Sequence, residues 1–150
     1  MGDSIECYGK CASLRAEATT PREKDIPTLT LDVALLKGGK VEKDNKISIQ
    51  LSTSELPILC GVLSGLLPRL HFQRPGKGIK IERQDNKVFV HASQGKEHIY
   101  ALPVNIGDTF RLTAFALNRL KEQSGLNGDN LTLALRGACA LYKPLNPQGI

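Results

Sequence analysis

The chain of 150 residues is 41% hydrophobic and carries a formal net charge of +5. This length is typical of one domain that buries a real core, and the hydrophobic fraction excludes a wholly disordered chain. No apolar run approaches the roughly 20 residues that span a bilayer, and the N-terminus lacks the apolar core of a secretory signal. We therefore expect a soluble, cytoplasmic protein without a membrane association.

Residues 1–26 are polar and show no apolar periodicity, which predicts a flexible N-terminal arm. A single α+β domain is expected over residues 27–143, followed by a C-terminal tail over residues 144–150. Near the end of this domain, "NLTLALRGACALY" (residues 130–142) alternates in places, which predicts a further strand or a docked segment.

The four cysteines are Cys7, Cys11, Cys60 and Cys139. Cys7 and Cys11 have a spacing that occurs in zinc sites, but no second close pair of ligands accompanies them. Cys60 lies in an apolar segment, where a thiol behaves as a small hydrophobe. A disulfide scaffold is not expected without a secretory signal, so we favour free thiols and predict neither a metal site nor a cofactor.

The first half of the predicted domain contains two strand signals and a helix. Residues 28–37 are strand-like, a charged turn "GGKVEKDN" follows, and "KISIQLS" alternates apolar and polar side chains. Ser52 and Glu55 have the spacing of a capping box, which favours a helix start. This apolar helix is expected to accommodate Pro57 near its first turn, where a missing N–H is tolerated, and to end near Gly65.

The second half contains four short strand signals, "RLHFQR", "IKIERQ", "VFVHAS" and "HIYALPV", separated by tight polar turns. This pattern predicts an antiparallel meander. A second helix is expected to run from Asn105 to a stop at Gly125, with Asp108 favouring its start. The stripe that this helix is predicted to bury consists of Phe110, Ala114, Leu117 and Leu120.

The two strand-to-helix junctions repeat each other at an offset of 53 residues. The apolar strand residues correspond in pairs: Ile47 to Tyr100, Ile49 to Leu102, and Leu51 to Val104. The acidic Glu55 likewise corresponds to Asp108. The sequence therefore predicts an α+β fold of two antiparallel β-meander-plus-helix units, of which the first is the shorter. Both helices are apolar on more sides than one sheet covers, which predicts a homo-oligomer, a dimer or tetramer, assembled through the helices.

This arrangement resembles the Whirly family of single-stranded-nucleic-acid-binding proteins, with the related positive-cofactor coactivators and mitochondrial guide-RNA-binding proteins. "KISIQLSTSELPILCGVL" is similar to their strand that leads through a Ser-rich cap into the first helix, and "IYALPVNIGDTFRLTAFALNRL" to their later strand, cap and long helix. The resemblance covers residues 28–123. It implies sheets that project from a helical hub, subunits joined through the helices, and single strands lying across the sheets. The compact sequence also resembles small accessory proteins of bacterial mobile elements.

The positive charge is concentrated between Arg69 and Lys96. This stretch contains seven basic residues against Glu82 and Asp85, a surplus of five that equals the net charge of the whole chain. A localised basic field attracts polyanions such as nucleic acid. The alternative interpretation is a solvated sheet face whose charges serve solubility.

Alternation within the later strands assigns six of the side chains to one outward face. We define the basic strip as these six residues: Arg69, His71, Lys80, Lys87, Phe89 and His91. Cations neutralise phosphates and a flat ring stacks on an unpaired base, so the basic strip predicts binding of single-stranded DNA or RNA. A subunit interface that covers Phe89 is the alternative.

Enzymatic motifs fit the sequence less well. "RPGKG" lacks the upstream glycine and the following Ser or Thr of a phosphate-binding loop, so it predicts a turn. The apolar surroundings of Cys60 argue against a reactive thiolate, and His71 and His91 are more simply two exposed side chains than a pair. We predict a non-enzymatic single-strand-binding protein, acting in DNA maintenance, transfer or transcription. The alternative is a helix-mediated oligomeric adaptor or structural protein whose basic face is incidental.

Overall fold

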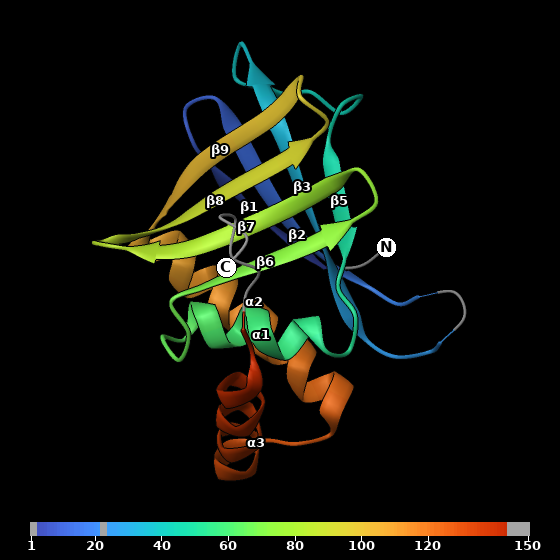
Figure 1. The fold of residues 1–150 in the computed structure, drawn as a ribbon, viewed down its shortest axis with the longest axis vertical. Coiled ribbons are helices and arrows are strands. Elements are labelled where there is room, and N and C mark those ends of the chain that lie inside the picture. Colours follow the sequence, from blue (N-terminus) through green and yellow to red (C-terminus); the bar gives the residue numbers. More distant parts are fainter. Residues whose placement is uncertain (1–2, 22–23, 144–150) are drawn as a thin grey trace.

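Two antiparallel sheets cross one another, and helices lie at one end of the pair (Figure 1). This computed structural model describes residues 3–21 and 24–143. The C-terminal tail predicted over residues 144–150 lies outside the described residues.

The described residues form nine strands and three helices, in the order β1 (Ser4–Tyr8), β2 (Ala12–Thr19), β3 (Thr28–Lys37), β4 (Lys40–Val41), β5 (Ile47–Gln50), α1 (Glu55–Leu63), β6 (Arg69–Arg74), β7 (Lys77–Gln84), β8 (Lys87–Gln94), β9 (His98–Asn105), α2 (Ile106–Ser124) and α3 (Gly128–Leu141). The predicted α+β class, with two strand-plus-helix units, is confirmed. None of these three helices combines the length and apolar character that crossing a bilayer requires.

The first sheet is built on β3, which pairs with β2 on one side and with β4 and β5 on the other, while β1 lies beyond β2. The prediction of a flexible arm is wrong for residues 4–19, because these residues form β1 and β2 and bury Leu14 in the core. The alternation in β2 escaped sequence analysis because three of its four inward positions are alanine, a weak apolar signal (Ala12, Leu14, Ala16 and Ala18). The first unit was predicted to be the shorter of the two. This prediction is wrong, because β1 and β2 extend the first unit.

The second sheet is the predicted meander of β6, β7, β8 and β9. One row of its inner face consists of residues that lie opposite one another across all four strands, Leu70, Ile81, Val90 and Leu102. All four are buried, and this face packs against the first sheet. At one point the sheets approach so closely that a Cβ atom on Gly9, in the turn between β1 and β2, would lie 2.8 Å from the Leu102 Cβ. The core therefore lies between the sheets, and their outer faces point in opposite directions.

Helix α1 begins with the predicted capping box. The Glu55 backbone N–H donates to the Ser52 hydroxyl oxygen at 3.2 Å, and the Ser52 backbone N–H donates to Glu55 Oε1 at 3.0 Å. At the other end, the Arg83 guanidinium donates to the carbonyl oxygens of Val62 and Leu63. Helices α2 and α3 both pack against α1, which explains why it is apolar nearly all round.

Helix α2 has the predicted ends, but the stripe that it buries shares only Leu120 with the predicted one. The Asn105 side chain caps it by accepting from the Asp108 backbone N–H at 2.8 Å, and Gly125 ends it in the left-handed conformation. The buried residues are Leu112, Ala116 and Leu120, whereas the predicted Phe110 is 75% exposed. Both stripes have helical spacing, and only packing against α1 and the sheets decides between them.

The segment predicted as a further strand or a docked segment is docked, but as helix α3. Its buried residues Leu131, Leu135 and Cys139 recur every four positions, which is a helical spacing. The docking is close, because a Cβ atom on Gly61 of α1 would overlap the Cys139 sulfur. The strand prediction is wrong because local alternation in "LTLAL" hid this longer period.

Candidate nucleic-acid interface

All six residues of the basic strip lie on β6, β7 and β8, on the face opposite to the buried row of the second sheet. The register places Lys80 directly between His71 and His91. One row along, Glu82 lies between Arg69 and Phe89. Lys87 precedes Phe89 by two residues on the same face of β8, so the structure brings the six side chains into adjacent rows.

Phe89 lies on the outward face of β8. Its neighbours Val88 and Val90 are buried, whereas Phe89 is half-buried and lies between Glu82 of β7 and Pro103 of β9. The ring therefore belongs to a surface rather than to the core between the sheets. Its role in binding stays a prediction.

Three of the seven basic residues between Arg69 and Lys96 hold the fold together. Arg74 pairs with Glu55 Oε1 at 2.6 Å and donates to the Gln50 carbonyl oxygen at 2.8 Å. Lys77 donates to the Ser48 carbonyl oxygen at 2.6 Å, so both residues tie the second sheet to the free edge of β5. Arg83 is the third, because it caps the end of α1.

The cations of the basic strip remain available for a ligand. Within residues 3–21 and 24–143, Arg69, Lys80 and Lys87 make no ion pair and no side-chain hydrogen bond. Glu82 lies between Arg69 and Phe89 and accepts a hydrogen bond from Gln84. The strip therefore carries three uncommitted positive charges against one carboxylate.

His71 contributes little charge at neutral pH. Burial, and then the nearby Lys80 ammonium, lower the pKa of its imidazole. Its Nδ1 atom is buried without a hydrogen-bond partner among the described residues. Its backbone N–H donates to the Tyr142 hydroxyl oxygen at 3.0 Å, so the residue that follows α3 covers this part of the β6 edge.

The cysteines offer no reactive thiolate at the strip. Burial raises the pKa of Cys60 to about 12 and that of Cys7 to about 11, so both thiols stay protonated at neutral pH. Cys7 is buried, whereas Cys11 is exposed in the turn after β1. In the part of the chain that the structure describes, no group of three or more His, Cys, Asp or Glu side chains is placed to hold a metal ion.

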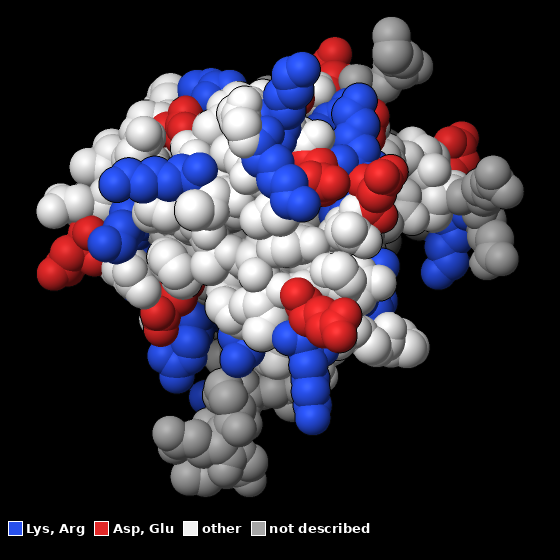
Figure 2. All heavy atoms as spheres, turned by 90° about the horizontal axis from the view of Figure 1, so that it is seen from above, with Lys and Arg blue, Asp and Glu red and all other residues white. Residues whose placement is uncertain are grey.

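Basic side chains are not confined to one side of the molecule. In the view from above (Figure 2), they project from several sides, with acidic side chains among them. Sequence reasoning therefore located only part of the charged surface. It missed Arg15 on β2 together with Lys43 and Lys46, which line a hollow on the outer face of the first sheet. The alternation within β2 could have placed Arg15 on an outer face, but it gives no sign of Lys43 and Lys46, which lie between β4 and β5.

Two crossed antiparallel sheets on a helical base define a Whirly-like fold, and solved structures confirm the resemblance. WHY1 from Arabidopsis thaliana superposes with a TM-score of 0.67 at 18% identity, over 97% of this chain and 97% of that chain. The plant transcriptional regulator PBF-2 gives 0.65 at 16% identity, over 83% and 84% of the two chains. A guide-RNA-binding protein complex bound to a guide RNA gives 0.65 at 10% identity, over 84% and 94%.

These identities establish the fold alone. No protein-family model matches the sequence, and no curated protein is significantly similar to it. The resemblance to accessory proteins of bacterial mobile elements stays a prediction, since none of these three structures is described in that way.

Proposed function

We propose that this protein is not an enzyme and that it binds single-stranded DNA or RNA through the basic strip. The observation that carries the proposal is the outward ring of Phe89 beside the uncommitted cations Arg69, Lys80 and Lys87. Cations neutralise the phosphates of any strand, while an exposed ring stacks only on a base whose face is free. A duplex hides its base faces, so this combination favours single strands.

The solved structures support nucleic acid as the ligand class. One is a complex that contains a guide RNA, and another is a transcriptional regulator. These descriptions belong to those proteins. They favour nucleic acid as the ligand class for this chain as well, and the basic strip supplies the matching chemistry.

The protein is proposed to act as a homo-oligomer joined through its helices. Large apolar side chains point to solvent on α2 and α3, where Phe110 is 75% exposed and Leu133 is 73% exposed. Covering them with the same surface of another subunit would remove apolar area from water. The same observation favours the second candidate function, an oligomeric adaptor whose basic face is incidental.

Charge removal from the strip tests the proposal. The variants Arg69→Gln, Lys80→Gln and Lys87→Gln should each weaken binding of a fluorescently labelled oligothymidine at several salt concentrations. Each loss should also reduce the slope of log K against log salt by about 0.7, because one fewer counterion is displaced. The matched control is Lys121→Gln on α2, whose exposed side chain lies outside the strip and should leave the slope unchanged. Equal effects of all four variants would contradict a site on the strip.

A further inference from the structure

The outer face of the first sheet contains a hollow of about 450 Å³. Its floor includes the small residues Ser13 of β2 and Ala34 of β3, which lie opposite each other in the register. Three cations line it: Arg15 from β2, and Lys43 and Lys46 from the segment between β4 and β5. Because the two outer faces point in opposite directions, this hollow is separate from the basic strip.

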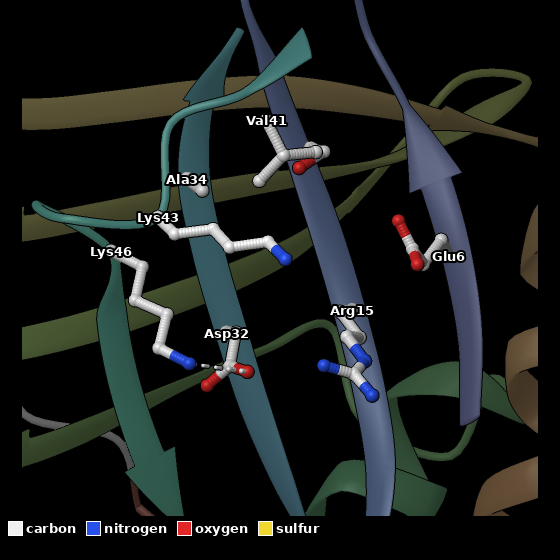
Figure 3. A pocket seen from close by; sticks show the side chains of 8 residues that line it. Glu6, Arg15, Asp32, Ala34, Val41, Lys43 and Lys46 are labelled. Atoms are coloured by element: carbon white, nitrogen blue, oxygen red, sulfur yellow. Dashed lines mark ion pairs between the residues drawn. The ribbon is translucent and has the colours of Figure 1, made fainter. Parts of the chain in front are cut away.

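The acidic side chains at the hollow already have partners. Glu6 accepts a hydrogen bond from the Tyr8 hydroxyl at 2.6 Å. Asp32 accepts from the Ser48 hydroxyl and pairs with Lys46 at 3.7 Å, which is the dashed contact in Figure 3. Asp32 therefore has a cationic partner, whereas the partner of Glu6 is a neutral hydroxyl group.

Two cationic side chains at the hollow have N–H groups without an acceptor among the described residues. The Lys43 side chain extends across β3 toward β2 (Figure 3), and its ammonium makes no ion pair with any described residue. Arg15 pairs with Glu17 through Nη2 at 3.3 Å, and its other terminal nitrogen, Nη1, makes no hydrogen bond with any described residue. Because both cationic side chains line the same hollow, an anion bound there would form charge-assisted hydrogen bonds with Arg15 and Lys43.

An aromatic ring lies beside these donors. Tyr8 lies opposite Ser13 in the register, on the same outer face, and is 58% exposed. Its hydroxyl donates to Glu6, which is one of the residues that line the hollow. An exposed ring next to an anion site is the combination that a nucleotide needs, and a volume of this size is typical of small-molecule sites.

We propose that the hollow binds one nucleotide, with its phosphate accepting from Arg15 Nη1 and Lys43 Nζ and its base stacked on Tyr8. The nucleotide is either free or one unit of a bound single strand, and only the second source rests on the proposed function.

Binding of a free nucleotide is tested by titrating ¹⁵N-labelled protein with thymidine 5′-monophosphate and, as a phosphate-free control, with thymidine. The amide signals of Ser13 and Ala34 should shift with the monophosphate and much less with thymidine. Lys43→Gln should abolish these shifts, whereas the control Lys40→Gln should preserve them, because Lys40 on β4 is exposed and does not line the hollow.

Binding of a nucleotide that is part of a single strand is tested by measuring the affinity for an oligothymidine. Tyr8→Ala should weaken binding by roughly 5- to 150-fold, the range for loss of one stacked base, while Tyr8→Phe keeps the ring and should bind as the wild type does. Lys43→Gln should weaken binding more than Lys40→Gln. Thermal melting of each variant checks that the first sheet stays folded.

The outcomes separate the two proposals. Shifts with the monophosphate but unchanged strand affinity assign a free nucleotide, and weaker strand binding without those shifts assigns a unit of the strand. If neither the shifts nor the weaker strand binding is observed, the nucleotide site is refuted. This holds even if Phe89→Ala abolishes strand binding, in which case the proposed function stands. Monophosphate shifts in a protein that binds no single strand would instead retain the hollow and refute the proposed function.

Discussion

Removing the Phe89 ring tests whether the outer face of the second sheet binds bases. Phe89→Ala should weaken single-strand binding by about 1–3 kcal/mol, the usual contribution of one stacked base. This corresponds to a roughly 5- to 150-fold increase in Kd. The salt dependence of binding should hardly change, because stacking displaces no counterions.

The adjacent residue Val90 provides the matched control. It is fully buried on the inner face, opposite Ile81 and Leu102, so shortening it leaves a cavity that the surrounding residues cannot readily fill. Val90→Ala removes apolar groups worth about 0.8 kcal/mol for each methylene equivalent. With the cavity included, we expect a loss of about 2–3 kcal/mol in the free energy of unfolding. Phe89 is only half-buried at the surface, so its removal should lower the melting temperature less.

Both variants are measured by thermal melting and by fluorescence anisotropy of a labelled oligothymidine, at a temperature where both remain folded. The expected pattern is a binding defect for Phe89→Ala and a stability defect for Val90→Ala. If Phe89→Ala unfolds the protein and the wild type ignores single strands, the ring is part of a core or a subunit interface. That result would refute the reasoning about the strip.

Three further predictions concern the fold and the assembly. Gly61→Ala should destabilise the protein by about 1–3 kcal/mol, because the new methyl group would overlap the Cys139 sulfur. Faster proteolysis within α3 would measure the undocking of α3 from α1. An unchanged rate of cleavage would contradict close packing of these two helices. Burial raises the pKa of Glu55, but hydrogen bonds from Arg74 and Ser52 outweigh it and the net shift is downward. The pair should therefore stabilise the fold above the ordinary carboxyl pKa of about 4.5 and lose this effect as the pH falls through the lowered pKa. The gap in melting temperature between the wild type and Arg74→Gln should close in acid, and a gap that is constant with pH would contradict this origin. Phe110→Asp should dissociate the expected homo-oligomer, and light scattering that shows a monomeric wild type at micromolar concentration would contradict helix-mediated assembly.

Local signals predicted strands β6 to β9 and the starts of helices α1 and α2 well. Strands β6 to β9 have strong apolar alternation and turn residues, and the capping residues Ser52 and Asn105 fix where α1 and α2 begin. These features depend on neighbours in the sequence, so they are visible without the structure. The alternation within β6, β7 and β8 also placed the basic strip on one face, and the register then aligned its residues.

The remaining features depend on packing between distant segments. β2 has alanines at most inward positions, and only its pairing with β3 shows that they are core. Helix α2 offers two apolar stripes, and contact with α1 and the sheets selects the one that contains Leu112. The hollow depends on the pairing of β1, β2 and β3, so the sequence gives no local sign that Lys43 and Arg15 face the same space.

The structural use of charge was also invisible in the sequence. Arg74, Lys77 and Arg83 contribute to the basic surplus as much as Arg69 and Lys80 do. Their partners are the Glu55 carboxylate and carbonyl oxygens at the edge of β5 and the end of α1, which come from other parts of the chain. A count of charges along the sequence therefore overestimates the cations available to a ligand.

Competition between single and double strands tests the central claim most directly. Labelled oligothymidine is bound to the wild-type protein and then challenged with unlabelled single-stranded DNA, single-stranded RNA or duplex DNA at two salt concentrations. The account predicts that a single strand displaces the label at far lower concentration than the duplex does, and that higher salt weakens binding. Equal displacement by single strands and duplex would show a merely electrostatic surface, and no binding of the label at low salt would contradict the account.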